Sequence, residues 1–492
     1  MSRWPVAVVC SVALIVAACG GSAKTTKKAA PAEPAAPVAV SEEVAGEQAR
    51  LFIEHLSEQR YADAAAMMTD KMKEAMPAEG LAKLWTGLQA KLGFYESLGA
   101  GVFTVKDTSH VMRAMAIFET IPVDLIVSIN PDKQVEGFFI RQVETARPQT
   151  PQPPLPYGER NVVFDNAVDG TKLGGTLSIP AEGERHPAVL LISGSGAQDR
   201  DSTIFGHKPF FVISDHLTRS GFVVLRLDDR GVGETTGDTG DATSEVQATD
   251  VVAALAFLKE QAEVDPKKVG LLGHSMGGAV APLVAANRKN GVAFVVSLAG
   301  PGVSGADLSA MQLEAFLRLD GKIPPPDIEK LVALQVKAQE TFVDSGDKAK
   351  VLELLEEARQ IGMQHLSEKH LKFMNDDMRA AQDAAQLATM ETPWFADFLK
   401  FNPSKHWKKV KCPVLVLIGE KDFQVPADAN MKPLVKALKR NKDVTATKVP
   451  GLNHLFQNAE TGQIIEYAQL DETFDPATLE VISAWLTKRF VK

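Results

Sequence analysis

The segment with the clearest chemical potential is residues 273–278, which read Gly-His-Ser-Met-Gly-Gly. A short apolar run at 269–272 precedes it, and small residues at 279–286 follow it. A strand, a sharp turn and a helix in that order form a nucleophile elbow, which holds a serine in a strained backbone conformation at the carboxyl edge of a sheet. Glycines flank the serine because a side chain there would collide with the neighbouring strand or helix. The pattern therefore predicts that Ser275 is a nucleophile.

An attacking serine needs a general base and an acid that orients the base. Residues 419–422 form a tight turn after an expected strand, and this turn ends in Asp422, the predicted acid. Residues 450–454 follow the next expected strand and end in His454, the predicted base. Because both turns lie at carboxyl ends of strands, as Ser275 does, the three side chains can converge at one edge of a sheet.

The roles of the three residues follow from charge. Neutral His454 takes the proton of Ser275 as the oxygen attacks a carbonyl carbon, and Asp422 fixes the imidazole tautomer and stabilises the imidazolium. His454 then protonates the leaving group and activates the water that releases the acyl group. Glu420 is the alternative acid, and the side chain of His274 is expected to point away from the site.

The oxyanion formed in this reaction needs two hydrogen-bond donors. The backbone N–H of Met276, at the expected start of the helix, is the first. The second is predicted in the loop 193–200, which follows an apolar strand and reads Ser-Gly-Ser-Gly-Ala-Gln-Asp-Arg. Glycines in this loop let backbone amides approach a ligand. Ser195 is the predicted donor, and Gly196 is the alternative.

No cofactor or metal is predicted. The pair Gly194 and Gly196 lacks the third glycine of a dinucleotide-binding loop, because Asp199 stands at that place, and no glycine loop is followed by a Walker lysine. His365 and His370 lack the spacing of a zinc-binding H-E-x-x-H helix.

A mostly parallel sheet must position these residues. Apolar strands are expected at 188–192, 222–227, 269–272, 293–298, 414–418 and 444–449, with an antiparallel opening pair at 161–165 and 173–179 and a helix at 244–260. Nearly continuous apolar strands indicate burial on both faces, as in a parallel sheet covered by helices. The predicted fold class of residues 161–492 is therefore α/β.

One stretch interrupts the alternation of strands and helices. Residues 305–400 contain helical patterns, such as 328–342 and 348–361, and no expected strand, which predicts a helical cap inserted after the sixth main strand. Trp394, Phe395 and Phe398, with Phe401, are predicted to form a substrate-binding wall, and the core of the cap is an equally good place for them.

A second, smaller domain is expected before the sheet. Five prolines between 148 and 156 indicate a stiff connector at 146–160. Before it, residues 41–145 have a helical pattern followed by strand-like runs, which predicts a small α+β domain. This order of elements resembles the small domains related to nuclear transport factors.

The beginning of the chain has the pattern of an export signal. Residues 1–18 combine a short basic region with an apolar stretch shorter than the roughly 20 residues of a membrane span. Residues 16–20 read Val-Ala-Ala-Cys-Gly, which resembles a bacterial lipobox and implies a lipid anchor on Cys19. Residues 19–40 are predicted to be a disordered tether. We expect an exported, membrane-anchored protein of the cell envelope, and a plain signal peptide is the alternative.

Composition argues against a nucleic-acid partner and against an intramolecular disulfide. The formal net charge of −9 disfavours a nucleic-acid partner. Of three cysteines, Cys10 lies in the expected signal and Cys19 carries the expected lipid, so Cys412 has no partner for an intramolecular disulfide.

Three segments narrow the class of protein: 194–201 (GSGAQDRD), 226–233 (RLDDRGVG) and 453–457 (NHLFQ). With the elbow, they resemble α/β-hydrolases of the serine esterase, acyl-peptidase and prolyl-oligopeptidase superfamily, and among these the exported bacterial carboxylesterases that carry a small amino-terminal domain. The resemblance covers residues 161–492 and implies hydrolysis of small carboxylic esters through a triad of Ser275, Asp422 and His454.

Two alternatives stay open. A peptidase or amidase could use the same triad, and an aminopeptidase would need a pocket acid such as Asp199 or Glu234 to bind the substrate amine. A cell-envelope binding protein could use the hydrolase domain as a scaffold. The sequence predicts no oligomeric state.

Overall fold

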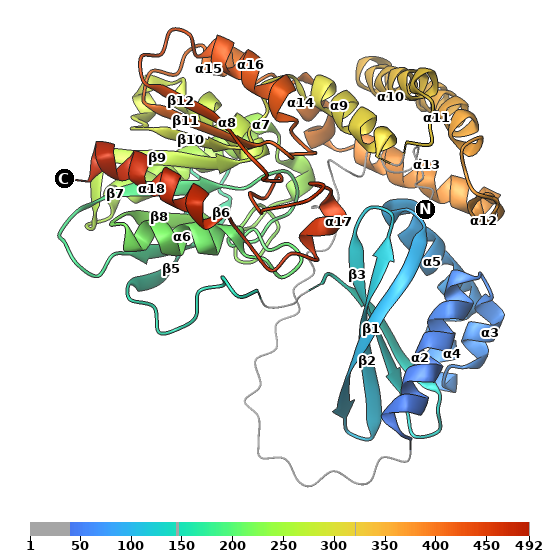
Figure 1. The fold of residues 1–492 in the computed structure, drawn as a ribbon. Coiled ribbons are helices and arrows are strands. Elements are labelled where there is room, and N and C mark those ends of the chain that lie inside the picture. The colour runs from blue at the N-terminus through green and yellow to red at the C-terminus, as the bar shows by residue number, and fades with distance from the viewer. Residues whose placement is uncertain (1–39, 144–146, 320, 492) are drawn as a thin grey trace. The chain divides into compact units, whose positions relative to one another are not determined.

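The computed structural model describes residues 40–143, 147–319 and 321–491, which form two compact units (Figure 1). The first unit contains residues 40–143 and 359–387, and the second contains the remaining described residues. The expected signal peptide, Cys19 and nearly all of the expected tether lie outside the described residues. In the part of the chain that is described, no helix combines the length and apolar character needed to cross a membrane.

The first unit has helices followed by an antiparallel sheet, which confirms the predicted α+β class. Its helices are α2 (Glu42–Ser57), α3 (Tyr61–Ala66), α4 (Asp70–Ala75) and α5 (Ala78–Leu92). Its strands are β1 (Tyr95–Lys106), β2 (Ser109–Phe118), β3 (Pro122–Ile129) and β4 (Val135–Arg141), paired in that order. Alternate residues of β2 are buried, so one face of the sheet forms a core with the helices around Phe52, Trp85 and Phe118.

The first unit also contains residues 359–387, which differs from the expected boundary of the cap at 305–400. Aromatic contacts within the unit explain this grouping. The ring of Phe94 stacks on His370 of α12 (Glu368–Phe373) with 4.6 Å between centroids, and Phe373 lies 6.0 Å away. Sequence periodicity predicted the helices here but carried no information about which core they join.

The second unit is built on an eight-stranded sheet with the order β12-β11-β10-β9-β7-β8-β6-β5. The strands are β5 (Gly158–Asp165), β6 (Lys172–Ile179), β7 (His186–Ile192), β8 (Val223–Leu227), β9 (Val264–His274), β10 (Val295–Leu298), β11 (Val414–Gly419) and β12 (Val444–Val449). The six strands β7 to β12 run parallel, and β6 runs antiparallel to both of its neighbours, β5 and β8. The predicted α/β class and the predicted opening pair are therefore confirmed.

Helices cover both faces of this sheet (Figure 1). Those outside the stretch between β10 and β11 are α6 (Pro209–Arg219), η2 (Thr239–Asp241), α7 (Ser244–Glu260), α8 (Met276–Ala285), η3 (Arg288–Asn290), α16 (Ala427–Ala437), α17 (Ile464–Tyr467) and α18 (Pro476–Phe490). Buried residues of α7, α8 and α16 pack in one core, and those of α6 and α18 pack in the other. Burial on both faces explains why the strands are apolar throughout.

The expected strand at 269–272 is longer in the structure. Its strand β9 begins at Val264, which pairs with His186, and an irregularity in register follows before Val269 pairs with Ala188. Asp265 and Pro266, a pair of residue types common in turns, lie in this irregular part of the strand. A proline is tolerated there because a bulge leaves its nitrogen out of the hydrogen-bond ladder.

The described residues between β10 and β11 contain helices and no strand. These helices are α9 (Gly305–Arg318), α10 (Pro325–Ser345), α11 (Lys348–Met363), α12, α13 (Asp376–Met390), α14 (Pro393–Lys400) and α15 (Ser404–Trp407). The insertion follows the sixth strand of the large sheet in chain order, as the sequence predicts.

The proline-rich segment, predicted to be a stiff connector between the domains, is tied to the second unit. The buried guanidinium of Arg147 donates to the carbonyl oxygens of Phe205 and Ala468 at 2.8–3.1 Å. The side chain of Gln149 donates to the carbonyl oxygen of Phe474 at 2.8 Å. Two polar side chains therefore fix a segment whose prolines cannot make regular backbone pairs.

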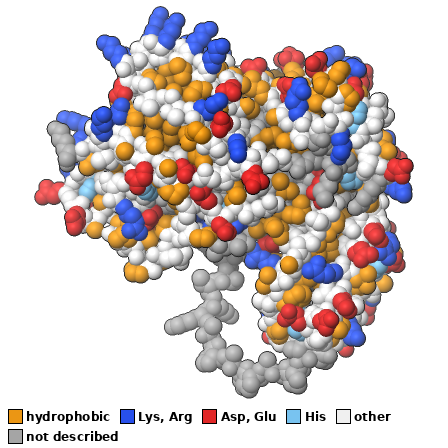
Figure 2. All heavy atoms as spheres, viewed as in Figure 1, with side chains coloured by type: hydrophobic (Ala, Val, Ile, Leu, Met, Phe, Trp, Pro, Cys, Tyr) orange, Lys and Arg blue, Asp and Glu red, His pale blue; other side chains and the backbone are white. Residues whose placement is uncertain are grey.

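On the face of the second unit drawn in Figure 2, basic side chains gather at one edge. Figure 2 shows Lys and Arg side chains gathered along its upper left edge, over α15 and α16, while both signs of charge mix elsewhere on this face. The exposed lysines near α15 are Lys405, Lys408, Lys409 and Lys411.

Candidate active site

Ser275 lies in the turn between β9 and α8 with φ 54° and ψ −121°. This backbone conformation is strained for a residue with a side chain. A Cβ on Gly273 would lie 2.2 Å from the carbonyl oxygen of Gly277, and a Cβ on Gly277 would lie 2.2 Å from that of Ile192. The turn is therefore possible only with glycine at both places, as a nucleophile elbow requires.

The predicted acid and base are brought together at the same edge of the sheet. Nδ1 of His454 lies 2.9 Å from Oδ2 of Asp422, and both side chains are buried. The other oxygen of Asp422 accepts hydrogen bonds from the N–H groups of Gln424 at 2.9 Å and Val425 at 2.7 Å. Because the carboxylate accepts the Nδ1 proton, the Nε2 atom of neutral His454 keeps a free lone pair.

A side-chain network builds the turn that presents His454. Oδ1 of the fully buried Asn453 accepts from the N–H groups of Leu455 at 3.0 Å and Gln457 at 2.9 Å. Its amide nitrogen donates to the side chain of Gln457 at 2.9 Å. Phe456 completes the turn with φ 61°. The network holds His454 in place without a regular element.

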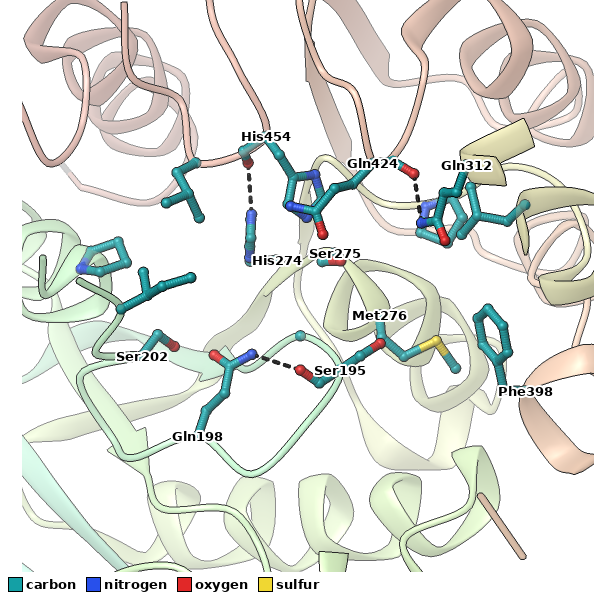
Figure 3. Close-up of a pocket in the computed structure, with 16 residues that line it drawn as sticks. Ser195, Gln198, Ser202, His274, Ser275, Met276, Gln312, Phe398, Gln424 and His454 are labelled. Carbon is teal, nitrogen blue, oxygen red and sulfur yellow. Dashed lines mark hydrogen bonds between the residues drawn. The ribbon is translucent and has the colours of Figure 1, made fainter. Parts of the chain in front are cut away.

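His274 lies in the site, and the expectation that its side chain points away is wrong. Its Nε2 atom donates to the carbonyl oxygen of His454 at 2.9 Å, and the two rings lie 4.7 Å apart (Figure 3). Burial, and the nearby His454, lower the pKa of His274 to about 3. The side chain is therefore neutral and acts as a fixed hydrogen-bond donor to the backbone of the predicted base.

The predicted oxyanion loop lies beside the elbow. A Cβ on Gly194 would lie 3.1 Å from Cβ of Ser275, so the backbone of this loop approaches the serine closely. The side chain of Gln198 donates to the carbonyl oxygen of Ser195 at 3.1 Å (Figure 3). The N–H of Met276 is the first of α8, and first-turn N–H groups have no acceptor within their own helix. Both predicted donors therefore border the space next to Ser275.

One carboxylate holds both ends of this loop. Asp229 accepts hydrogen bonds from the hydroxyl of Ser193 and from the N–H of Gln198, the latter at 2.9 Å. Its own N–H donates to the carbonyl oxygen of Gln198 at 3.0 Å. Burial raises the pKa of Asp229 to about 7.

A pocket at this edge is lined by Ser275, His454, Met276 and Ser195, together with residues of α9 and α14 (Figure 3). Of the predicted aromatic wall, only Phe398 lines it. Trp394 and Phe395 are buried in the packing of α14, and Trp394 stacks on Phe398 with 5.1 Å between ring centroids. The expected wall is thus corrected to one residue, because Trp394 and Phe395 are buried in the protein interior and Phe401 does not line the pocket.

The carboxylates suggested for an aminopeptidase are engaged elsewhere. Asp199 accepts from the N–H groups of Asp201 and Thr203 within its own loop, and Glu234 pairs with Arg200 at 2.9 Å. Neither residue lines the pocket. The residues that the structure describes also contain no group of His, Cys, Asp and Glu suited to hold a metal ion.

Several residues of the pocket were missed by the sequence analysis: Gln198, Ser202, Gln312 and Gln424. Gln198 stands inside the segment 194–201 that carried the family resemblance, so its place in that motif was an available signal. Gln312 comes from a helix about 40 residues after Ser275, and its sequence surroundings give no sign of a pocket.

The elbow, the buried acid–base pair and the parallel sheet define a serine hydrolase of the α/β-hydrolase class. A family model described as "Alpha/beta hydrolase family" matches residues 189–464, more than half of the chain. The chain therefore belongs to this family, which confirms the predicted resemblance. A second model, described as "Protein of unknown function (DUF3887)", matches residues 49–138 in the first unit.

Three individual proteins show what the chain is similar to. Esterase EstD of Thermotoga maritima is 23% identical over 446 residues, which cover 90% of this chain and 95% of that protein. An uncharacterized protein of Mycobacterium tuberculosis is 35% identical over 134 residues, covering 27% of this chain and 43% of its own. Among solved structures, an esterase of Pyrococcus furiosus aligns with a TM-score of 0.41 at 15% identity, covering 71% of this chain and all of that chain.

Proposed function

We propose that this protein hydrolyses small carboxylic esters through a covalent acyl-enzyme on Ser275. The observation that carries the proposal is the buried pair of His454 and Asp422 at 2.9 Å, in one pocket with a serine on a strained elbow. The Thermotoga maritima relative, an esterase aligned along 90% of this chain, supports the ester as the bond cleaved.

The proposed reaction proceeds in two halves. Nε2 of His454 takes the proton of Ser275 while the serine oxygen forms a bond to the carbonyl carbon, and the N–H groups of Met276 and Ser195 donate to the resulting oxyanion. The tetrahedral intermediate breaks its bond to the alcohol, which leaves with the proton from His454. A water molecule, deprotonated by His454, then releases the acid and restores Ser275.

A direct test uses the purified protein without residues 1–40. A fluorophosphonate probe should label Ser275, and 4-nitrophenyl esters of increasing acyl length should be cleaved. The Ser275→Ala variant should lose both properties, with turnover near background. Retention of most ester turnover by this variant would sink the triad assignment, and a wild-type protein that resists the probe would favour the scaffold alternative.

An aminopeptidase is disfavoured by the pocket. The positive amine of a peptide needs an acidic partner, and no Asp or Glu side chain lines the pocket in the described part of the chain. Aminoacyl 4-nitroanilides are therefore expected to be poor substrates beside short acyl esters. Faster cleavage of the anilides would instead assign the triad to amide hydrolysis.

We also propose that the protein is exported and held at a membrane by a lipid on Cys19. The support is the apolar stretch before Val-Ala-Ala-Cys-Gly in the sequence. In a bacterial host, an alkyne fatty-acid analogue should label the full chain and not the Cys19→Ala variant. Equal labelling of both proteins would contradict the anchor at this residue.

A further inference from the structure

A buried glutamine of α9 lines the pocket beside the predicted nucleophile. Gln312 is 5% exposed, and its Nε2 atom donates to the carbonyl oxygen of Gln424 at 2.8 Å (Figure 3). A backbone carbonyl can only accept a hydrogen bond, so the NH2 group of Gln312 must face it. The position of the amide oxygen is thereby fixed on the other side.

That amide oxygen is an unused acceptor. Oε1 of Gln312 is buried and has no hydrogen-bond partner among the described residues. Folded proteins rarely leave a buried polar atom unpaired, because its loss of solvation is costly. An acceptor at the wall of a substrate pocket can be satisfied by a donor that the substrate brings.

A second polar atom in the pocket is unpaired as well. The hydroxyl of Ser202 is buried without a partner among the described residues, and this residue is 6% exposed. Ser202 is held with φ 52°, and its N–H donates to the carbonyl oxygen of Asp199 at 2.8 Å. In Figure 3, Ser202 and Gln312 lie on opposite sides of Ser275. The pocket therefore offers hydrogen bonds on two sides of the reacting bond.

Apolar side chains also line the pocket, among them Ile204, Leu308, Phe398 and Leu455. Such a lining suits an amphiphilic substrate, because apolar surface supplies affinity and a few placed polar groups supply orientation. The amide oxygen of Gln312 accepts from hydroxyl and N–H donors, and no Asp or Glu among the described residues lines the pocket to balance an ammonium group.

We infer that the preferred substrate is an ester bearing a hydroxyl or amide N–H group that donates to Oε1 of Gln312. The inference rests on the proposed esterase function and adds the substrate class to it. A site built around a buried acceptor rejects an analogue that replaces the donor by a methyl group, because the acceptor is then left unpaired. Gln312 is thus a specificity-determining residue.

The donor can stand on the acid or on the alcohol part of the ester, and matched pairs separate the two cases. The acyl arm compares the 4-nitrophenyl esters of 3-hydroxybutyrate and 3-methylbutyrate. The alcohol arm compares 2-hydroxyethyl butyrate with propyl butyrate, followed by titration of the released acid. Each pair exchanges a hydroxyl for a methyl group of similar size. One arm should show a preference of at least about tenfold in kcat/KM for the hydroxyl compound.

Two variants assign this preference to Gln312. Gln312→Met has similar length and no acceptor, so the ratio between the two esters should fall to near one. Gln312→Glu keeps an acceptor oxygen and should retain the preference at pH 8. Both variants lose the bond to the carbonyl oxygen of Gln424, near Asp422, so absolute rates should fall in both. The ratio of kcat/KM between the hydroxyl ester and the methyl ester is independent of this shared loss, so it reports recognition of the substrate hydroxyl alone.

The wild-type ratio decides the inference even if a variant fails to fold. A ratio near one in both arms overturns it, and so does a preference that survives in folded Gln312→Met. In either case plain esters are still cleaved and the esterase proposal stands. If instead no ester is cleaved and the fluorophosphonate probe does not label Ser275, the proposed function itself fails.

Discussion

His274 donates a hydrogen bond from Nε2 to the backbone carbonyl oxygen of His454 at 2.9 Å. The two residues come from different strand ends, since His274 ends β9 and His454 follows β12. The bond therefore joins the turn that carries the nucleophile to the turn that carries the base. It fixes the position of His454 from its backbone, while Asp422 fixes the imidazole ring.

Replacing His274 should slow the reaction without greatly changing substrate binding. His274→Phe keeps the ring and removes the donor, so the base is less well placed and kcat should fall about tenfold, equal to roughly 1.4 kcal/mol in the barrier. His274→Gln places an amide donor near the former Nε2 atom and should recover part of the loss. Steady-state kinetics on a short 4-nitrophenyl ester measure both constants. Equal activity of wild type and His274→Phe would contradict this role.

Asp229 should add a pH-dependent step to the activity. Its ionised carboxylate accepts from Ser193 and from the N–H of Gln198, and both bonds hold the oxyanion loop. Burial raises the pKa of Asp229 to about 7, so the group takes up a proton, and loses part of its capacity to accept, as the pH falls through this value. Wild-type kcat should therefore decline below about pH 7.

The Asp229→Asn variant tests this contribution because its amide retains one acceptor and cannot ionise. Its kcat should be about tenfold below wild type at pH 8.5, where the wild-type carboxylate is charged. The gap between the two proteins should narrow towards pH 6, where the wild-type group is mostly protonated. A gap that stays constant from pH 6 to 8.5 would show that Asp229 has a structural role only.

Asp422→Asn should retain the fold and lose most of the activity. Oδ1 accepts from two backbone N–H groups, and an asparagine oxygen can take over these bonds. The amide nitrogen then faces Nδ1 of His454 and favours the tautomer with its proton on Nε2, which cannot act as a base. A fall in kcat of about 10³–10⁴-fold is expected. The melting temperature is the control for folding, and a variant with a wild-type melting temperature and more than a tenth of the activity contradicts the assignment.

The sequence predicted the triad because each of its residues follows a strand-and-turn pattern that can be recognised locally. Ser275, Asp422 and His454 each follow a short apolar strand, and parallel strands bring their carboxyl ends to one edge. Strand positions were predicted to within a few residues for the same reason, since burial on both faces leaves a continuous apolar run. At Pro266 the sequence pattern indicated a turn, whereas in the structure the strand continues through this residue at a bulge.

The remaining features depend on packing between distant segments. The direction of the His274 side chain is set by the turn after β12, and Gln312 enters the pocket only because α9 packs beside α14 and the Asp422 loop. Residues 359–387 have a clear helical pattern, but they group with the first unit, where the ring of Phe94 stacks on His370. Periodicity predicts that a helix buries one face and does not say against what.

His207 links the start of α6 to the segment that follows α17. It is fully buried, with Nδ1 2.9 Å from the hydroxyl of Thr473 and Nε2 2.9 Å from the carbonyl oxygen of Tyr467. Because the carbonyl accepts, Nε2 carries the proton and Nδ1 of the neutral ring accepts from the threonine hydroxyl. Burial lowers the pKa of His207 to about 4.

Acidification should therefore destabilise the protein in the pH range where the histidines of the unfolded chain take up protons. The folded state keeps His207 neutral, whereas an unfolded histidine has a pKa of about 6.5 and binds a proton below that pH. The unfolded state thus binds more protons between about pH 6.5 and 4, and the free energy of unfolding falls as the pH is lowered through this window. His274, whose pKa is also lowered, contributes in the same direction. His207→Gln keeps a donor to Tyr467 and loses the imidazole ring, so its melting temperature should be lower than wild type at pH 7.5. Because glutamine does not titrate, this melting temperature should drop less between pH 6.5 and 5. Thermal denaturation followed by circular dichroism measures both slopes, and parallel slopes would exclude His207 as the cause.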